Sequence, residues 1–211
     1  MAYFPVFMDI AGQEVLIVGG GTVALRKVEK LLPYEPRITL VAPNVDARIR
    51  AHTEVNISEC EFEEPMLEKK KLVIAAADDR ALNTRISALC REKGVLVNVV
   101  DRREDCTFLF PALVKRGELS IGISTGGASP TAAIYLKNQI SELLPNNFDS
   151  IITFLEQKRE YIKTVSASEQ IRAKIFKGLF EVALFKDQPL TDSECTEVIQ
   201  TIFDNHLEEN S

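Results

Sequence analysis

The sequence has no tryptophan, only two histidines and four scattered cysteines in 211 residues. Two histidines cannot supply the three imidazoles of a three-histidine zinc site within one chain. The cysteines form no Cys-x-x-Cys pair, which argues against a structural zinc site and against a disulfide framework. No metal ligand is therefore predicted, and the thiols are expected to be reduced.

Long apolar runs and an excess of positive charge are also missing. No uninterrupted apolar stretch is long enough to span a bilayer, and the first residues lack the basic segment of a signal peptide. Lysine and arginine number 25 against 31 aspartates and glutamates, a net charge of −6. A large nucleic-acid interface needs a basic face, which this balance does not indicate. We therefore expect a cytoplasmic protein with neither a membrane nor a nucleic-acid partner.

Short apolar runs alternate with amphipathic segments through the first half of the chain. The apolar runs have the composition of buried parallel strands, and the segments between them place apolar residues at helical spacing, as in Ala24, Val28 and Leu31. Strands joined by helices predict an α/β fold, a parallel sheet with helices on both faces. The expected strands are 14–18, 37–42, 55–62, 71–76 and 96–100.

The pattern changes near residue 112. Two apolar stretches, 108–114 and 118–124, are separated by a short turn that contains glycine and predict a hairpin. Ser129 followed by Pro130 is a strong helix start, because serine caps the first turn and proline fits its opening position. From residue 148 onward the apolar periodicity is helical, so we expect a helical C-terminal part.

A glycine-rich loop follows the first predicted strand and leads directly into a helix. Its sequence, GGGTVA, fits the pattern G-x-G-x-x-A of Rossmann-type dinucleotide-binding folds. The glycines allow a tight turn and a close approach of backbone to a pyrophosphate, which the N–H groups of the helix start can bind. The alternative is a glycine-rich turn without a ligand. The predicted cofactor residues here are Gly19, Gly20, Gly21, Thr22 and Val23.

The second predicted strand lacks the acidic residue that usually ends it in this motif. An aspartate or glutamate there binds the ribose hydroxyls of the adenosine, whereas this strand is followed by Pro43 and Asn44. Asn44 can bond to a ribose hydroxyl, but it lacks the charge that repels a 2′-phosphate. The residues alone leave the choice between NAD and NADP open.

Asp101 closes the fifth predicted strand. Ligands of parallel sheets bind at the carboxyl ends of the strands, so this carboxylate is placed to act as a general base beside a bound cofactor. The alternative is an aspartate that only stabilises a turn.

Several separate motifs, in order, resemble the dehydrogenase module of siroheme synthase, the precorrin-2 dehydrogenase family. The resemblance extends from residue 3 to about residue 145. The motifs are Pro5-Val6-Phe7, Gly19 to Lys27, Val41-Ala42-Pro43, Ala75 to Asp79, Asn98-Val99-Val100-Asp101 and Ser124 to Pro130.

The resemblance implies a homodimeric enzyme that oxidises precorrin-2 to sirohydrochlorin with NAD. It implies a Rossmann domain over 1–112, a dimerisation region over 113–145 and a helical C-terminal domain over 146–211. NAD is expected on the glycine loop and near Pro43, Asn44, Ala77 and Asp78. Asp101 is the expected catalytic group. Some members of the family also insert iron, and the residues leave this second activity open.

Precorrin-2 is a polycarboxylate, so an acidic chain needs local positive charge and anion-binding turns to hold it. The alternative for these basic side chains is that they only face solvent and bind no substrate. Cys106 is interpreted as a packing residue, because no base adjoins it to activate a nucleophile. The resemblance and these considerations predict substrate contacts at Asn98, Arg102, Lys115, Ser124, Thr125 and Gly126.

Two other functions compete with this one. A non-enzymatic Rossmann module that senses nucleotides would explain the glycine loop and a dimer, but not the motifs around Asp101 and Ser124. A dehydrogenase of another small substrate is disfavoured, because no plausible catalytic histidine or lysine occurs in the first half. Bound porphyrinoid would distinguish the enzyme from the sensor.

Overall fold

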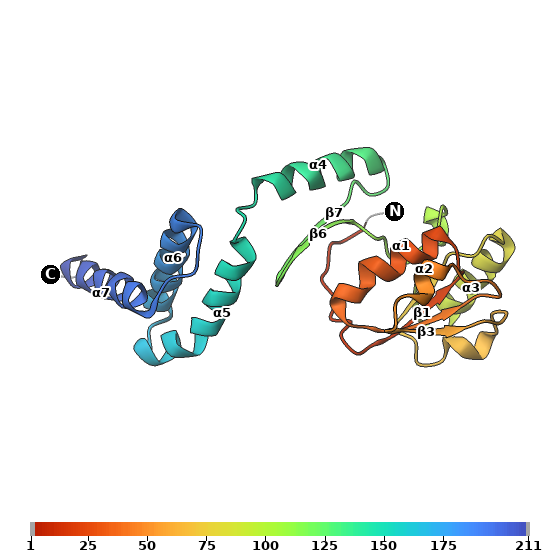
Figure 1. Cartoon of the computed structure of the whole chain (residues 1–211), viewed down its shortest axis with the longest axis horizontal. Helices are drawn as coiled ribbons and strands as arrows, with labels where there is room; N and C mark the ends of the chain where they lie inside the picture. The colour runs from red at the N-terminus through yellow and green to blue at the C-terminus, as the bar shows by residue number, and fades with distance from the viewer. Residues whose placement is uncertain (1–2, 210–211) are drawn as a thin grey trace. The chain divides into compact units, whose positions relative to one another are not determined.

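The computed structural model describes residues 3–209, with side chains described through His206. The chain forms two compact units, Met1–Phe110 and Pro111–Ser211. Figure 1 shows the path of the chain through both units.

The N-terminal unit is a five-stranded parallel sheet in the order β3-β2-β1-β4-β5. Its order places β1, which precedes the glycine loop, at the centre. Its strands are β1 (Glu14–Val18), β2 (Arg37–Val41), β3 (Val55–Ser58), β4 (Leu72–Ala75) and β5 (Leu96–Val99). Its helices are α1 (Thr22–Leu31), α2 (Ala47–Arg50) and α3 (Arg80–Glu92), with short 3-10 turns η1 (Leu32–Tyr34), η2 (Glu64–Leu67) and η3 (Arg103–Asp105).

Alternate residues of the strands point to opposite faces of the sheet, and each face has its own apolar cluster. Val15 and Ile17 of β1 pack on the side of α1 and α2, whereas Leu16 and Val18 pack on the side of α3. Both faces are thus covered by helices, and the predicted α/β class is confirmed.

Two predicted strands have limits that differ from those of the structure by more than one residue, and the others agree to within one residue at each end. The third strand ends at Ser58 rather than at residue 62, because the chain turns there and Phe62 packs into the cluster on the α3 side. The first hairpin strand begins at Ala112 rather than at residue 108. Phe108 and Phe110 pack instead against the cluster on the α1 side, and the Phe108 carbonyl accepts a hydrogen bond from Asn98.

The C-terminal unit begins with an antiparallel hairpin, β6 (Ala112–Arg116) and β7 (Leu119–Ile123), as predicted. Ser129 caps the next helix by accepting a hydrogen bond from the Ala132 N–H at 3.2 Å, and Pro130 is its first residue. The helices of this unit are α4 (Pro130–Leu143), α5 (Phe148–Val165), α6 (Glu169–Lys186) and α7 (Asp192–Glu209). The last three share a third apolar cluster. Among the described residues, no helix combines the length and the apolar character required to cross a bilayer.

Candidate cofactor pocket and the adjoining strand end

A pocket of about 440 Å³ lies at the carboxyl ends of three neighbouring strands, β2, β1 and β4. Backbone hydrogen bonds join the three segments beyond the strand ends: Gly19 N–H donates to Val41 O at 2.9 Å, and Ala76 N–H donates to Val18 O at 2.7 Å. The lining residues are Gly19, Gly20, Gly21, Ala42, Pro43, Asn44, Val45, Asp46, Ala76, Ala77 and Asp78.

The glycine loop forms the floor of this pocket, and its three glycines have different surroundings. Gly19 has a φ of 124°, and a Cβ there would overlap the Ala76 carbonyl. A Cβ at Gly20 would overlap the Asn44 carbonyl, whereas a Cβ at Gly21 would meet no protein atom within 4 Å. Gly21 therefore faces open pocket space beside the first turn of α1, which begins with Thr22 and Val23. A dinucleotide fits this arrangement, because the unpaired N–H groups of a first helical turn bind phosphate.

The wall after β2 holds an acidic residue that the sequence analysis missed. Asn44 lines the pocket as predicted, but so does Asp46, which caps α2 and whose N–H donates to Gly20 O at 2.9 Å. Hydrogen bonds from Arg48 lower the pKa of Asp46 to about 2. Arg48 also donates to the Thr22 hydroxyl at 3.3 Å. An acidic residue therefore lines this wall two positions beyond Asn44, and its carboxylate is bonded to Arg48 and to the first turn of α2.

The wall after β4 contains the predicted Ala77 and Asp78. Asn83 of α3, 5% exposed, holds this turn at both backbone groups of Ala77: its Oδ1 accepts from the N–H at 3.1 Å, and its Nδ2 donates to the carbonyl at 2.8 Å. Asp79 caps α3. Asn83 was not predicted, although an asparagine on the buried, apolar face of a helix is a recognisable signal.

Asp101 lies two residues beyond β5, at the strand end next to that of β4. Val100 N–H donates to Ala75 O at 3.0 Å, which joins this segment to the wall of the pocket. The Asp101 side chain is exposed, and its φ is 61°, in the left-handed region that few non-glycine residues adopt. Glu35, Lys69 and Asp187 share this conformation, and aspartate is among the residues that tolerate it best. Asp101 itself does not line the pocket described above.

Asn98 was predicted to contact substrate, but its amide is 6% exposed and already bonded to protein. Its Oδ1 accepts from the Lys27 ammonium at 3.1 Å, and its Nδ2 donates to Phe108 O at 3.1 Å. Lys27 lies over the Phe110 ring, 3.9 Å from its centroid. Burial lowers the pKa of Lys27 to about 8. The placement of Asn98 favours a supporting role, and direct contact with substrate stays a prediction.

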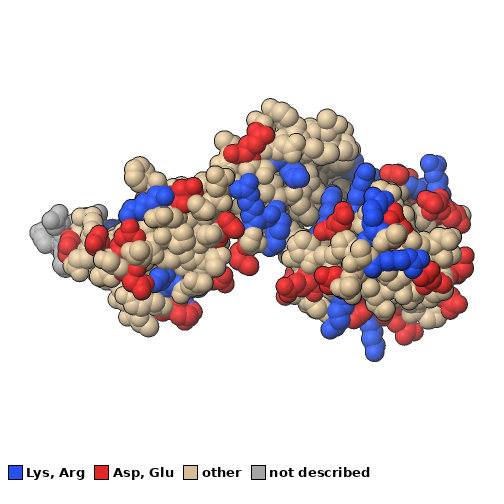
Figure 2. Space-filling view, viewed as in Figure 1, with Lys and Arg blue, Asp and Glu red and all other residues tan. Residues whose placement is uncertain are grey.

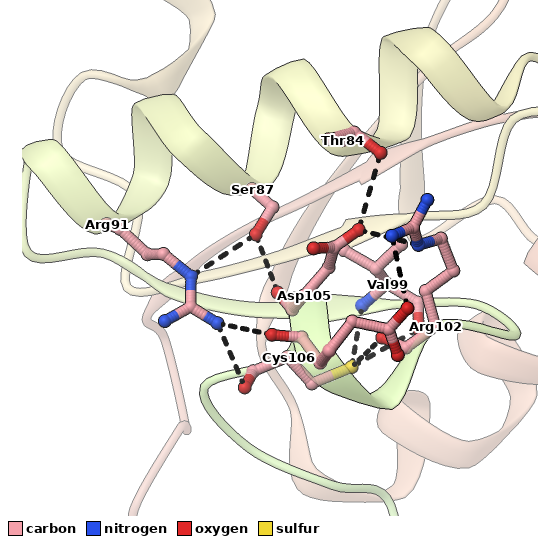
Figure 3. A network of polar contacts seen from close by, with 8 residues as sticks. Thr84, Ser87, Arg91, Val99, Arg102, Asp105 and Cys106 are labelled. Carbon is pink, nitrogen blue, oxygen red and sulfur yellow. Dashed lines mark hydrogen bonds and ion pairs between the residues drawn. The ribbon is translucent and has the colours of Figure 1, made fainter.

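Arg102 also has protein partners. Its guanidinium lies 2.9 Å from Asp105 and 3.1 Å from Glu104. Its side chain remains 40% exposed, so an added anion has access to it. Figure 3 shows Arg102 within a polar network that also contains Thr84, Ser87, Arg91 and Cys106.

The remaining predicted substrate residues belong to the C-terminal unit. Ser124 accepts a hydrogen bond from Gly126 N–H at 3.1 Å, and Thr125 exchanges hydrogen bonds of 3.0 Å with the backbone of Ser129. Gly126 has a φ of 62°. These bonds form a closed turn directly before α4 and occupy the N–H groups of Gly126 and Ser129, so anion binding by this turn stays a prediction.

Lys115 lies on β6 opposite Ser120 and is partly buried. The neighbouring Arg116 donates to the carbonyls of Ser141 and Pro145, so this guanidinium stabilises the end of α4.

Figure 2 shows basic and acidic side chains interspersed over the visible face of the N-terminal unit, on the right. Among the described residues, no three His, Cys, Asp or Glu side chains are grouped so that they could hold a metal ion.

Residues 6–112 match the protein family described as "Putative NAD(P)-binding". The chain belongs to this NAD(P)-binding family. Within the C-terminal unit, residues 116–143 match a second family, described as "Sirohaem biosynthesis protein central". The N-terminal unit is therefore a dinucleotide-binding domain, as the glycine loop predicted.

Relatives and solved structures agree with this assignment. A siroheme synthase of Thioalkalivibrio sulfidiphilus is 35% identical over 86% of this chain and 38% of its own length. Another, of Actinobacillus pleuropneumoniae serotype 7, is 32% identical over 100% of this chain and 44% of its own length. The chain thus spans about two fifths of the length of these curated relatives.

The structure of SirC, a precorrin-2 dehydrogenase, superposes with a TM-score of 0.76 at 27% identity, covering 96% of this chain and 100% of SirC. The resemblance to the siroheme synthase dehydrogenase module, inferred from the sequence motifs, is confirmed. These similarities give no support to the alternative of a nucleotide-sensing regulatory module.

Proposed function

We propose that this chain oxidises precorrin-2 to sirohydrochlorin with NAD as the hydride acceptor. The observation that carries the proposal is the pocket on the glycine loop, which adjoins the strand end that presents Asp101. The likeness to SirC over 96% of this chain and 100% of SirC supports the same substrate.

The pocket would hold NAD through backbone and small side chains. Gly21 and the first turn of α1 would face the pyrophosphate, and the wall after β2 would face the adenosine ribose. Asp46 lines the same wall, with its carboxylate paired with Arg48. When bound, NAD supplies the acceptor for the hydride. The proposed cofactor residues are Gly19, Gly20, Gly21, Thr22, Val23, Pro43, Asn44, Ala77 and Asp78.

Asp101 would accept the proton that precorrin-2 loses as the hydride leaves. An exposed carboxylate at the edge of the sheet can reach a large substrate, and its fixed backbone restricts where it points. The oxidised tetrapyrrole gains conjugation, so the residues mainly orient the substrate and take up one proton.

The substrate carboxylates need positive charge and N–H groups. Arg102 follows Asp101 in the chain and keeps a side chain that is 40% exposed, and the exposed Ser124 shapes the turn before α4. The residues proposed for substrate binding are Asn98, Arg102, Lys115, Ser124, Thr125 and Gly126, with Asn98 acting through its protein partners.

A homodimer in the cytoplasm completes the proposal, with a Rossmann domain over 1–112, a dimerisation region over 113–145 and a helical domain over 146–211. Four apolar residues of α4 support an interface there, because each is more than 40% exposed: Ile134, Tyr135, Leu136 and Leu143. Figure 2 shows a surface over α4 that is largely neither basic nor acidic.

Anaerobic incubation with precorrin-2 and NAD tests this function directly. The visible spectrum should change to that of sirohydrochlorin only when NAD is present, and NADP should support a slower reaction. Added ferrous or cobaltous ion, compared with a protein-free control, tests whether the product is also metallated. A folded protein that binds NAD and produces no spectral change would overturn the proposal.

A further inference from the structure

The loop between β5 and Cys106 holds Asp101 in a left-handed backbone conformation. Aspartate tolerates a left-handed φ better than most residues with a Cβ, and the contacts of the loop select this conformation among the others open to the chain. The contacts of this loop therefore decide where the Asp101 carboxylate points.

The thiol of Cys106 contacts the backbone on both sides of Asp101. Its Sγ accepts a hydrogen bond from Val99 N–H at 3.2 Å, and it lies 3.2 Å from the carbonyl oxygens of Val99 and Arg102, to either of which it can donate. Cys106 is 4% exposed. The thiol thus closes the segment from residue 99 to residue 102 into a ring of protein contacts.

Two side chains of α3 hold a different part of the same loop. Ser87 donates to Asp105 O at 2.6 Å, and Arg91 donates to Glu104 O at 2.9 Å (Figure 3). These bonds fix residues 104 and 105. The residues nearer Asp101 contact the sulfur, and two backbone bonds add to it: Val100 N–H donates to Ala75 O at 3.0 Å and Asp105 N–H donates to Arg102 O at 3.2 Å.

The same sulfur is joined to the helix that follows the glycine loop. Asn98 Nδ2 lies 3.5 Å from Cys106 Sγ, and its Oδ1 accepts from Lys27 of α1. A chain of polar contacts therefore runs from α1 through Asn98 and the thiol to the Asp101 loop.

We propose that Cys106 is a positioning residue for Asp101, acting through the hydrogen bonds of its thiol rather than through its volume. This inference rests on the proposed function, in which Asp101 accepts a proton from the substrate. Burial raises the pKa of the Cys106 thiol, so at neutral pH the group keeps its proton and can both donate and accept.

Three substitutions separate hydrogen bonding from packing. Cys106→Ser keeps a donor and an acceptor in a smaller side chain, Cys106→Val fills the space without polar atoms, and Cys106→Ala does neither. We expect kcat for precorrin-2 oxidation to fall about 10-fold to 100-fold in the valine and alanine variants and to stay within about 3-fold in the serine variant. The KM for NAD should be unchanged in all three.

Cys90 provides the matched control. It is fully buried in the same apolar cluster as Cys106, and its thiol makes no hydrogen bond to any described residue. Cys90→Ala should lower the melting temperature about as much as Cys106→Ala while leaving kcat unchanged. If the alanine variant of Cys106 does not fold, the comparison of serine with valine still decides the question.

Amide hydrogen exchange tests the same contacts without any turnover. Exchange over residues 99–105 should accelerate in the valine variant, remain slow in the serine variant and remain slow in Cys90→Ala. If valine preserves both kcat and slow exchange while serine loses them, the thiol only fills space and the proposal is wrong. Wild-type protein without dehydrogenase activity, but with the expected exchange pattern, would refute the proposed function and leave the role of Cys106 in the loop intact.

Discussion

The two units bury their strands to different degrees. All of β4 and four of the five residues of β1 are buried, because helices cover both faces of the parallel sheet. In the hairpin of the C-terminal unit only Val114 is buried. The N-terminal unit can therefore form a ligand site from backbone that its buried strands hold in place. The C-terminal unit instead presents an exposed turn and an exposed apolar helix.

The largest effect should follow from adding one methyl group to the rigid site. Gly19→Ala should leave little folded protein, because the Cβ overlaps the Ala76 carbonyl and the backbone is left-handed. Gly21→Ala should fold normally and bind NAD about 10-fold more weakly, because its Cβ enters only pocket space. Thermal denaturation and NAD titration check both variants. A stable, NAD-binding Gly19→Ala protein would contradict the described loop.

Asp101→Asn tests whether the Asp101 carboxylate of the N-terminal unit takes up the proton of the substrate. Asparagine tolerates the left-handed conformation but cannot take up the proton, so we expect kcat to fall about 100-fold or more. The NAD dissociation constant and the melting temperature should be close to those of the wild type. Stopped-flow measurement of NADH formation checks the rate, and undiminished turnover would remove Asp101 from the mechanism.

Ser124→Ala extends the comparison to the C-terminal unit. Loss of the hydroxyl that accepts from Gly126 N–H should loosen the turn and raise the KM for precorrin-2 about 10-fold, with NAD affinity unchanged. Thr201→Ala is the control, because it removes an exposed hydroxyl bonded to Glu197 O in α7. Equal effects of the two variants on KM would show that the turn does not contact substrate.

The smallest effect concerns the buried ammonium of Lys27. Its pKa is lowered to about 8, so between about pH 8 and pH 10.5 the folded state has released a proton that the unfolded state still binds. Stability relative to Lys27→Met should therefore rise by roughly 1–2 kcal/mol from pH 8 to pH 10. Urea denaturation of both proteins at several pH values measures this, and a constant difference would mean that burial does not lower the pKa.

Most of the fold and the floor of the pocket were predictable because they depend on local patterns. The strand–glycine–helix order places Gly19 to Val23 at a strand end, and alternation of apolar residues assigns each strand to a two-sided sheet. The capping of α4 by Ser129 follows equally from a short motif. These features use residues close together in the chain.

Contacts between distant residues were not predictable in the same way. Asp46 was overlooked because the wall after β2 extends farther than the motif suggests. Asn98 and Cys106 were given a substrate contact and a packing role, because nothing local indicates that they contact each other or that the Cys106 thiol bonds to the backbone on both sides of Asp101.

By itself, the sequence determined the α/β class, the glycine-loop site, the hairpin and the helical C-terminal part, since periodicity and turn chemistry act over a few residues. Only the tertiary structure determined which polar groups form hydrogen bonds with other residues of the protein and which face open space. Lys27 and Asn98 are 71 positions apart, and their hydrogen bond exists only once α1 packs against the sheet. The same packing places a buried thiol where it can hold Asp101 in position.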